Sequence, residues 1–219
     1  VTGVQTCALP IYVTAQTTAT VDEQVMLCGG LGAHGYKNLG WGLGGTKYFF
    51  YKDAEGKPDG MAGDYLPPLM MFDAVEGATT KLGPGKPSAD LSLIAYGDKG
   101  APENNNVQSL KVINWNGDVL YDLPLDLPAT GTANFTFDWA KGRNVLAFVE
   151  TDCTETPCVS QAFFVDPAWN LPQNIVADFS PGLLKVSWVD GMTLHFIDEE
   201  NKGWLYSFAT GEITENTQH

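Results

Sequence analysis

The chain has 219 residues, and its 26 acidic side chains outnumber the 12 basic ones, which gives a formal net charge of −14. Phosphate binding needs clustered Lys and Arg, so this charge argues against nucleic acid as a partner and against an anionic membrane surface. No apolar run approaches the roughly 18 residues of a membrane-spanning helix, so no membrane insertion is expected. The length suits one domain with a packed core.

The first residues are predicted to lie outside the domain. Residues 1–11, VTGVQTCALPI, resemble the translation of a short-read sequencing adapter along their whole length. They are therefore excluded as an artefact, with an ordinary N-terminal segment as the alternative. Val13, Thr14 and Ala15 have the spacing of a secretory cleavage site, so residues 12–24 are interpreted as a polar linker or the end of a signal peptide. Residues 25–219 are predicted to form a single β-propeller domain, for the reasons that follow.

Short apolar or alternating runs fill this domain and are separated by Gly, Pro, Asn and Asp, which is the signature of strands. The runs recur in a fixed order. Each unit opens with a Trp, passes a Gly-containing turn and continues into a run that ends in an aromatic residue. The four copies are residues 41–50, 88–96, 139–148 and 188–196, of which the second lacks the Trp. The three Trp-led copies start 98 and 49 residues apart, which indicates a period of about 49 residues.

A second motif follows in each unit and combines an apolar run, a polar turn residue, a nearby Gly and a short outer strand. Its copies begin at Leu69, Leu110, Ala162 and Trp204. Each unit therefore predicts four short antiparallel strands, and a four-stranded sheet repeated at this period is a propeller blade. The predicted fold class is all-β, a β-propeller of about four four-stranded antiparallel blades, either whole or as a fragment of a larger propeller. A β-sandwich is the alternative.

The units resemble the blades of TolB-type propellers and of the related propellers that cap prolyl oligopeptidases. Those blades carry a Ser-Pro-Asp-Gly-like turn followed by an apolar-apolar-Ala-Phe strand. The matching stretches are residues 139–148, residues 87–90 with 93–96, and residues 179–182 with 189–191. The resemblance covers about residues 39–215 and implies architecture more than function. Such propellers usually have six or more blades, whereas about four units are found here.

In such a fold each blade covers the face of its neighbour. Trp41, Trp139 and Trp188 are therefore predicted to lie in the core between blades. Tryptophans exposed on a sugar-binding face are the alternative.

Cysteine spacing predicts one disulfide. Once Cys7 is set aside with the excluded segment, Cys28, Cys153 and Cys158 remain. Cys153 and Cys158 frame a short loop between two strand-like runs, so we predict that they pair, with two unpaired thiols as the alternative. A disulfide implies an oxidising compartment, so the expected localisation is extracellular or periplasmic. Cys28 is left over.

One acidic segment resembles a calcium loop. Asp53, Glu55, Asp59 and Asp64 place oxygen ligands at near-alternating positions around a turn Gly. Lys57 occupies a ligand position and no Glu closes the loop, so a solvated hairpin loop is the alternative. No other cofactor is expected.

The sequence offers no clear catalytic constellation. It contains no Gly-x-Ser-x-Gly elbow, and neither a nucleotide-binding loop nor a catalytic triad can be composed from its residues. The leading hypothesis is a secreted or periplasmic, non-catalytic binding or scaffolding module. Its protein or glycan ligand is expected at channel-mouth loops formed by residues 52–68, 104–106 and 153–158. The alternatives are a glycan-active hydrolase or lyase that uses channel-mouth carboxylates, and the propeller fragment of a larger multidomain protein.

Overall fold

The fold was analysed in a computed structural model, which describes residues 36–42, 45–52, 68–101, 103–167 and 172–216. These residues form fifteen strands and no helix. The segments assigned to an artefact and to a linker lie outside the described residues, as do Cys28 and the predicted calcium loop.

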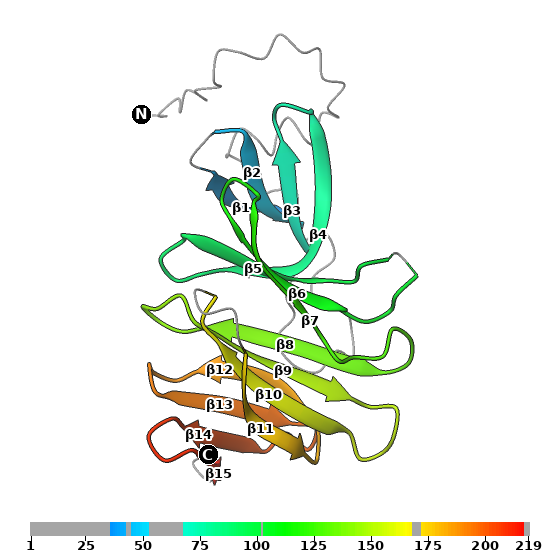
Figure 1. Ribbon diagram of the computed structural model, residues 1–219, viewed down its shortest axis with the longest axis vertical. Helices are drawn as coiled ribbons and strands as arrows, with labels where there is room; N and C mark the ends of the chain where they lie inside the picture. The colour runs from blue at the N-terminus through cyan, green and yellow to red at the C-terminus, as the bar shows by residue number, and fades with distance from the viewer. Residues whose placement is uncertain (1–35, 43–44, 53–67, 102, 168–171, 217–219) are drawn as a thin grey trace, which may run out of the picture.

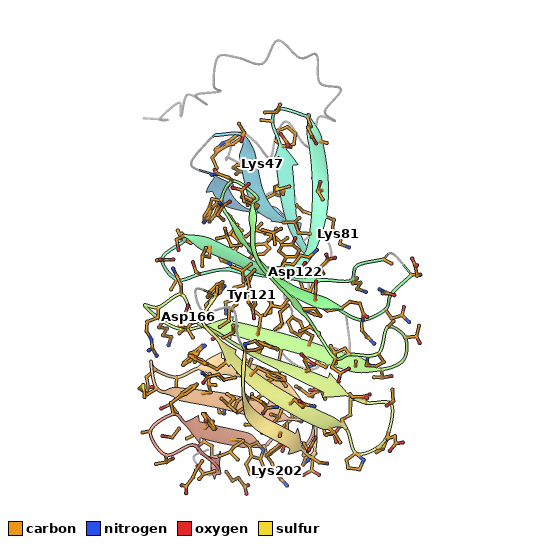
Figure 2. All side chains as sticks on the ribbon, in the orientation of Figure 1. Lys47, Lys81, Tyr121, Asp122, Asp166 and Lys202 are labelled. Atoms are coloured by element: carbon orange, nitrogen blue, oxygen red, sulfur yellow. A yellow bond between two sulfur atoms is a disulfide. The ribbon has the colours of Figure 1, made fainter. Side chains whose placement is uncertain are left out.

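The strands fall into four consecutive antiparallel groups, which we number as blades one to four (Figure 1). Blade one contains β1 (Tyr36–Trp41), β2 (Lys47–Lys52), β3 (Pro68–Asp73) and the first part of β4 (Ala78–Pro87). Blade two contains the end of β4, β5 (Leu93–Asp98), β6 (Ser109–Asn114) and β7 (Val119–Pro124). Blade three contains β8 (Ala133–Trp139), β9 (Leu146–Asp152), β10 (Val159–Val165) and β11 (Gln173–Phe179). Blade four contains β12 (Leu183–Trp188), β13 (Thr193–Asp198), β14 (Gly203–Ser207) and β15 (Glu212–Asn216).

Strand β4 joins the first two blades into one seven-stranded sheet. Residues 78–84 of this strand pair with β3, whereas residues 85–87 pair with β5. Gly83 lies at the change of partner with a φ of +139°, and a Cβ there would come within 2.1 Å of the Gly97 carbonyl oxygen. The bend therefore needs a residue without a side chain.

The core consists of apolar layers between successive blades. On β13, Leu194 and Phe196 are fully buried and alternate with half-buried residues, as expected for a strand with one face against a neighbour. These two side chains pack with Ala147 and Val149 of blade three. Separate clusters fill the space between blades two and three and between blades one and two.

The side chain at one equivalent position is larger in blade one than in blades two and three. Strand pairing makes Phe49, Ala95 and Ala147 equivalent, because each comes one residue after the partner of the last residue in the first strand of its blade. Phe49 meets the edge of Trp115 at a centroid distance of 5.3 Å. The strands of blade one run along the long axis of the molecule, whereas those of blades three and four run across it (Figure 1).

The architecture confirms the predicted all-β fold with four propeller-type blades. The sheets follow one another in chain order, with blade one and blade four at opposite ends of the molecule (Figure 1). The two-layer sandwich does not describe this arrangement, because it would place all strands in two facing sheets.

Candidate functional site

Of the three expected ligand-binding loops, the first, residues 52–68, lies almost wholly outside the described residues. The second and third loops share one end of the blades. Residues 99–108, of which 102 is not described, connect β5 to β6, and residues 153–158 connect β9 to β10. Both join the second and third strands of their blades, and antiparallel order places such connections at the same end.

The predicted disulfide is present in the third of these loops. Cys153 and Cys158 are bonded, with a Cα–Cα distance of 4.4 Å. The four predicted calcium ligands, Asp53, Glu55, Asp59 and Asp64, lie in a part of the chain that is not described. Among the residues that are described, no group of three or more His, Cys, Asp or Glu could hold a metal ion.

Several carboxylates at this end of the blades accept hydrogen bonds within turns. Asp98, Asp152 and Asp198 each end the second strand of a blade. Each accepts a hydrogen bond from the backbone N–H two residues further on, at 3.0, 2.8 and 2.9 Å respectively. Such bonds stabilise the turn that follows a strand. These three acids therefore have the same structural role in their blades, and no catalytic role is needed to explain them.

Glu150 differs from these turn carboxylates. It lies near the end of β9, is only 8% exposed, and its Oε2 accepts a hydrogen bond of 3.0 Å from the backbone N–H of Asp126. Burial raises the pKa of Glu150; the hydrogen bond from Asp126 opposes this shift, and the Asp126 charge adds to it. A carboxyl group with a raised pKa can hold a proton at a higher pH than ordinary glutamate.

The three predicted anchor tryptophans have two different environments. Trp139 and Trp188 are buried, with 4% and 3% exposure. Their indole N–H groups donate to backbone carbonyls of the preceding blade, Trp139 to Lys86 at 2.9 Å and Trp188 to Asp138 at 3.1 Å. Trp41 is 36% exposed. The prediction of an inter-blade position is thus confirmed for Trp139 and Trp188 and is wrong for Trp41, whose exposure fits the alternative.

Trp41 lies at a pocket between blades one and two. The pocket has a volume of about 440 Å³, which falls in the usual range for small-ligand sites. Its described lining comes from the end of β1, the β4–β5 turn and the β6–β7 turn. The lining residues are Leu39, Gly40, Trp41, Leu91, Ser92, Asn114, Trp115 and Asn116. These elements place the pocket at the opposite end of the blades from the expected loops.

Aromatic contacts and a close backbone approach shape the pocket walls. Trp41 packs against Tyr48 at a centroid distance of 5.0 Å, and Trp115 packs edge-on against Phe49. Gly42 follows β1, and a Cβ there would lie 1.7 Å from the Trp115 carbonyl oxygen. Only glycine permits this approach, so the sequence after Trp41 helps to set the distance between the two walls.

Most polar groups of the lining have partners within the protein. The Asn114 side chain accepts hydrogen bonds from the backbone N–H groups of Asn116 and Asp118 and donates one to the Asp118 carboxylate. Ser92 donates to Asp90 and accepts a hydrogen bond from Asn144 of blade three. The indole Nε1 of Trp115 is buried and has no acceptor among the described residues, although buried donors are normally paired. Because this nitrogen is buried, Trp115 contributes its ring rather than an accessible donor to the pocket wall.

The pocket rim carries a fixed negative charge. Hydrogen bonds from the Ser88 hydroxyl, from the Ser92 backbone and hydroxyl, and from Asn144 hold the pKa of Asp90 well below its usual range. Asp90 therefore stays ionised next to the lining residues Leu91 and Ser92. Leu91 is 57% exposed and has a φ of +58°, a conformation that is uncommon for a leucine.

Sequence analysis named Trp41 as a core residue, with exposure only as the alternative, and missed the rest of the pocket. Trp115 lies in the β6–β7 turn, and a tryptophan within a turn rather than a strand was the available signal. Leu91 and Asn116 gave no signal, because they come near Trp41 only through the packing of blade one on blade two.

Comparisons with known proteins add little to this geometry. No protein-family model matches the chain, and no curated protein sequence matches it either. Among solved structures it is similar to an oligogalacturonate lyase in complex with manganese, with a TM-score of 0.46 and 16% sequence identity. The match covers 85% of this chain and 53% of the lyase chain, so this chain spans about half the length of that protein.

Within the part of the chain that the structure describes, no helix has the length and apolar character needed to cross a bilayer.

Proposed function

We propose that this protein is a non-catalytic binding module that acts outside the cytoplasm and holds a small ligand in the pocket between blades one and two. The pocket carries the proposal. Its eight described lining residues are uncharged, and they combine indole and leucine side chains with Ser and Asn side chains. Such a lining favours binding over acid–base chemistry, which needs titratable groups at the reacting atoms.

The proposed location rests on the disulfide. The bond between Cys153 and Cys158 closes a loop in a segment that the structure describes. Disulfides persist in oxidising compartments, so its presence supports an extracellular or periplasmic location.

The pocket can be tested with a fragment library and the indole N–H signals of the ¹⁵N-labelled protein. The Trp115 signal is assigned from its loss in Trp115→Phe. We expect bound fragments to shift this signal and to leave the Trp188 signal, assigned in the same way, unchanged. Fragments that shift the signals of buried Trp188 or Trp139 and never that of Trp115 would contradict the proposal.

A second candidate function is a glycan-active enzyme that uses a carboxylate at the other end of the blades. The observation that favours it is Glu150, a buried carboxyl whose pKa is raised by burial. A screen for reducing ends or unsaturated products released from polysaccharides tests this candidate. Turnover that is lost in Glu150→Gln, with the fold intact, would replace the binding-module proposal.

A further inference from the structure

The pocket between blades one and two is bordered by carboxylates as well as by aromatic side chains. We propose that it binds a small organic cation, an ammonium group carried on an apolar body, and this inference rests on the proposed function. Three features carry it: an accessible indole, two aspartates in contact with the lining, and the pairing of the lysine that reaches the same wall.

The first feature is the accessible aromatic wall. Trp41 is 36% exposed, so its indole can touch a ligand, and it packs against Tyr48 at a centroid distance of 5.0 Å. Trp115 adds its ring to the same lining. The face of an indole attracts a cation through its quadrupole, more strongly than the other aromatic side chains do. An aromatic wall alone would accept many apolar ligands, so the charge beside it decides the class.

The second feature is a pair of carboxylates in contact with the lining. Asp90 Oδ1 accepts a hydrogen bond of 2.8 Å from the hydroxyl of the lining residue Ser92. Asp118 Oδ2 accepts one of 2.9 Å from the amide of the lining residue Asn114. Both aspartates are exposed. Hydrogen bonds, of which that from Ser88 has the largest effect, lower the pKa of Asp90 and keep it ionised.

The third feature is the lack of an opposing positive charge. None of the eight described lining residues is basic. Lys47 reaches the β6–β7 turn, where its Cε lies 3.7 Å from the position that a Cβ on Gly117 would take. Its ammonium group pairs with the Asp73 carboxylate, so its charge is offset. The field at the pocket is therefore negative, as is the net charge of −14, and favours a cation over an anion.

The test compares ligands of nearly the same shape and different charge. Choline is the cation, 3,3-dimethyl-1-butanol is its neutral isostere, and 3,3-dimethylbutanoate is the anion. Each is titrated into the ¹⁵N-labelled full chain while the Trp41 and Trp115 indole signals are followed, each assigned from its loss in the Phe variant. We expect choline to bind about tenfold more tightly than the alcohol and the butanoate not to bind. Raising the ionic strength from about 0.02 M to about 0.5 M should reduce this preference.

Two variants separate the charge from the ring. Asp90→Asn should weaken choline binding by about fivefold and leave binding of the alcohol unchanged. Trp41→Leu keeps an apolar side chain and should weaken choline binding more than binding of the alcohol.

Asp190→Asn is the matched control for Asp90→Asn. Asp90 and Asp190 each accept the backbone N–H two residues further on, at 2.9 and 2.7 Å. Asp190 lies in blade four and is not bonded to a lining residue of the pocket. Its variant removes the same charge and should bind choline like the wild type. Equal losses in the two variants would assign the preference to the net charge of the chain and overturn the site.

The remaining outcomes separate this inference from the proposed function. If fragments shift the Trp115 signal but choline binds no better than the alcohol or the butanoate, the cation class is wrong and the pocket proposal stands. If neither the fragments nor any of these ligands shifts the Trp41 or Trp115 signal, the proposed function fails and this inference fails with it.

Discussion

The inter-blade tryptophans provide a quantitative test of the packing. In Trp188→Phe the indole hydrogen bond to the part-buried Asp138 carbonyl is lost, while the Trp188 side chain itself is buried. A lost buried partner costs about 1–3 kcal/mol. The smaller ring also leaves a cavity beside Phe208, which stacks on the indole at a centroid distance of 5.6 Å. With about 1 kcal/mol for that cavity, the free energy of unfolding should fall by about 2–4 kcal/mol.

Equilibrium unfolding in urea, followed by far-ultraviolet circular dichroism, measures this change. Trp139→Phe should behave like Trp188→Phe, because its indole donates to Lys86 in the same way. Trp41→Phe is the matched control, since that residue is 36% exposed, and should cost less than about 1 kcal/mol. Equal losses for Trp41→Phe and Trp188→Phe would refute the reasoning.

Three further predictions concern charge, covalent structure and metal binding. Because burial raises the pKa of Glu150, its protonation stabilises the fold at low pH, and this stability is lost as pH rises through the raised pKa. Glu150→Gln should therefore have a higher Tm than the wild type at about pH 8 and an equal Tm near pH 4; a constant difference between them would contradict this. Replacing both Cys153 and Cys158 with Ser should lower stability by about 2 kcal/mol, from the entropy of the short closed loop, and reductant should lower the Tm of the wild type but not of the variant. The predicted calcium loop should make the Tm of the wild type rise in about 5 mM calcium, whereas a variant with Asp59→Asn and Asp64→Asn should not respond; an equal response of both proteins would exclude that site.

The strands could be predicted from sequence because their signals are local. Apolar runs such as residues 146–149 and the Gly residues near turns depend only on neighbours in the chain. The 49-residue period then grouped the strands into blades. Turn-capping acids such as Asp98 and Asp198 are also local, but the sequence does not distinguish them from acids that are free to react.

The pocket could not be predicted because it depends on how two blades pack. Trp41 and Trp188 occupy equivalent places in their repeats, yet Trp188 has a preceding blade with a carbonyl to bond and Trp41 is partly exposed. In blade one, Trp41 lies beside the β6–β7 turn of blade two at the pocket. These are relations between distant residues, and a repeat pattern does not encode them.

An experimental structure that resolves ordered water and a soaked fragment tests the central claim most directly. The claim is that the folded protein has an open pocket between blades one and two, lined by Trp115 and the partly exposed Trp41. The account predicts ordered water in the unsoaked crystal, and a bound fragment in the soaked one, in contact with these lining residues. A collapsed pocket in which Trp41 is buried against the protein would contradict it.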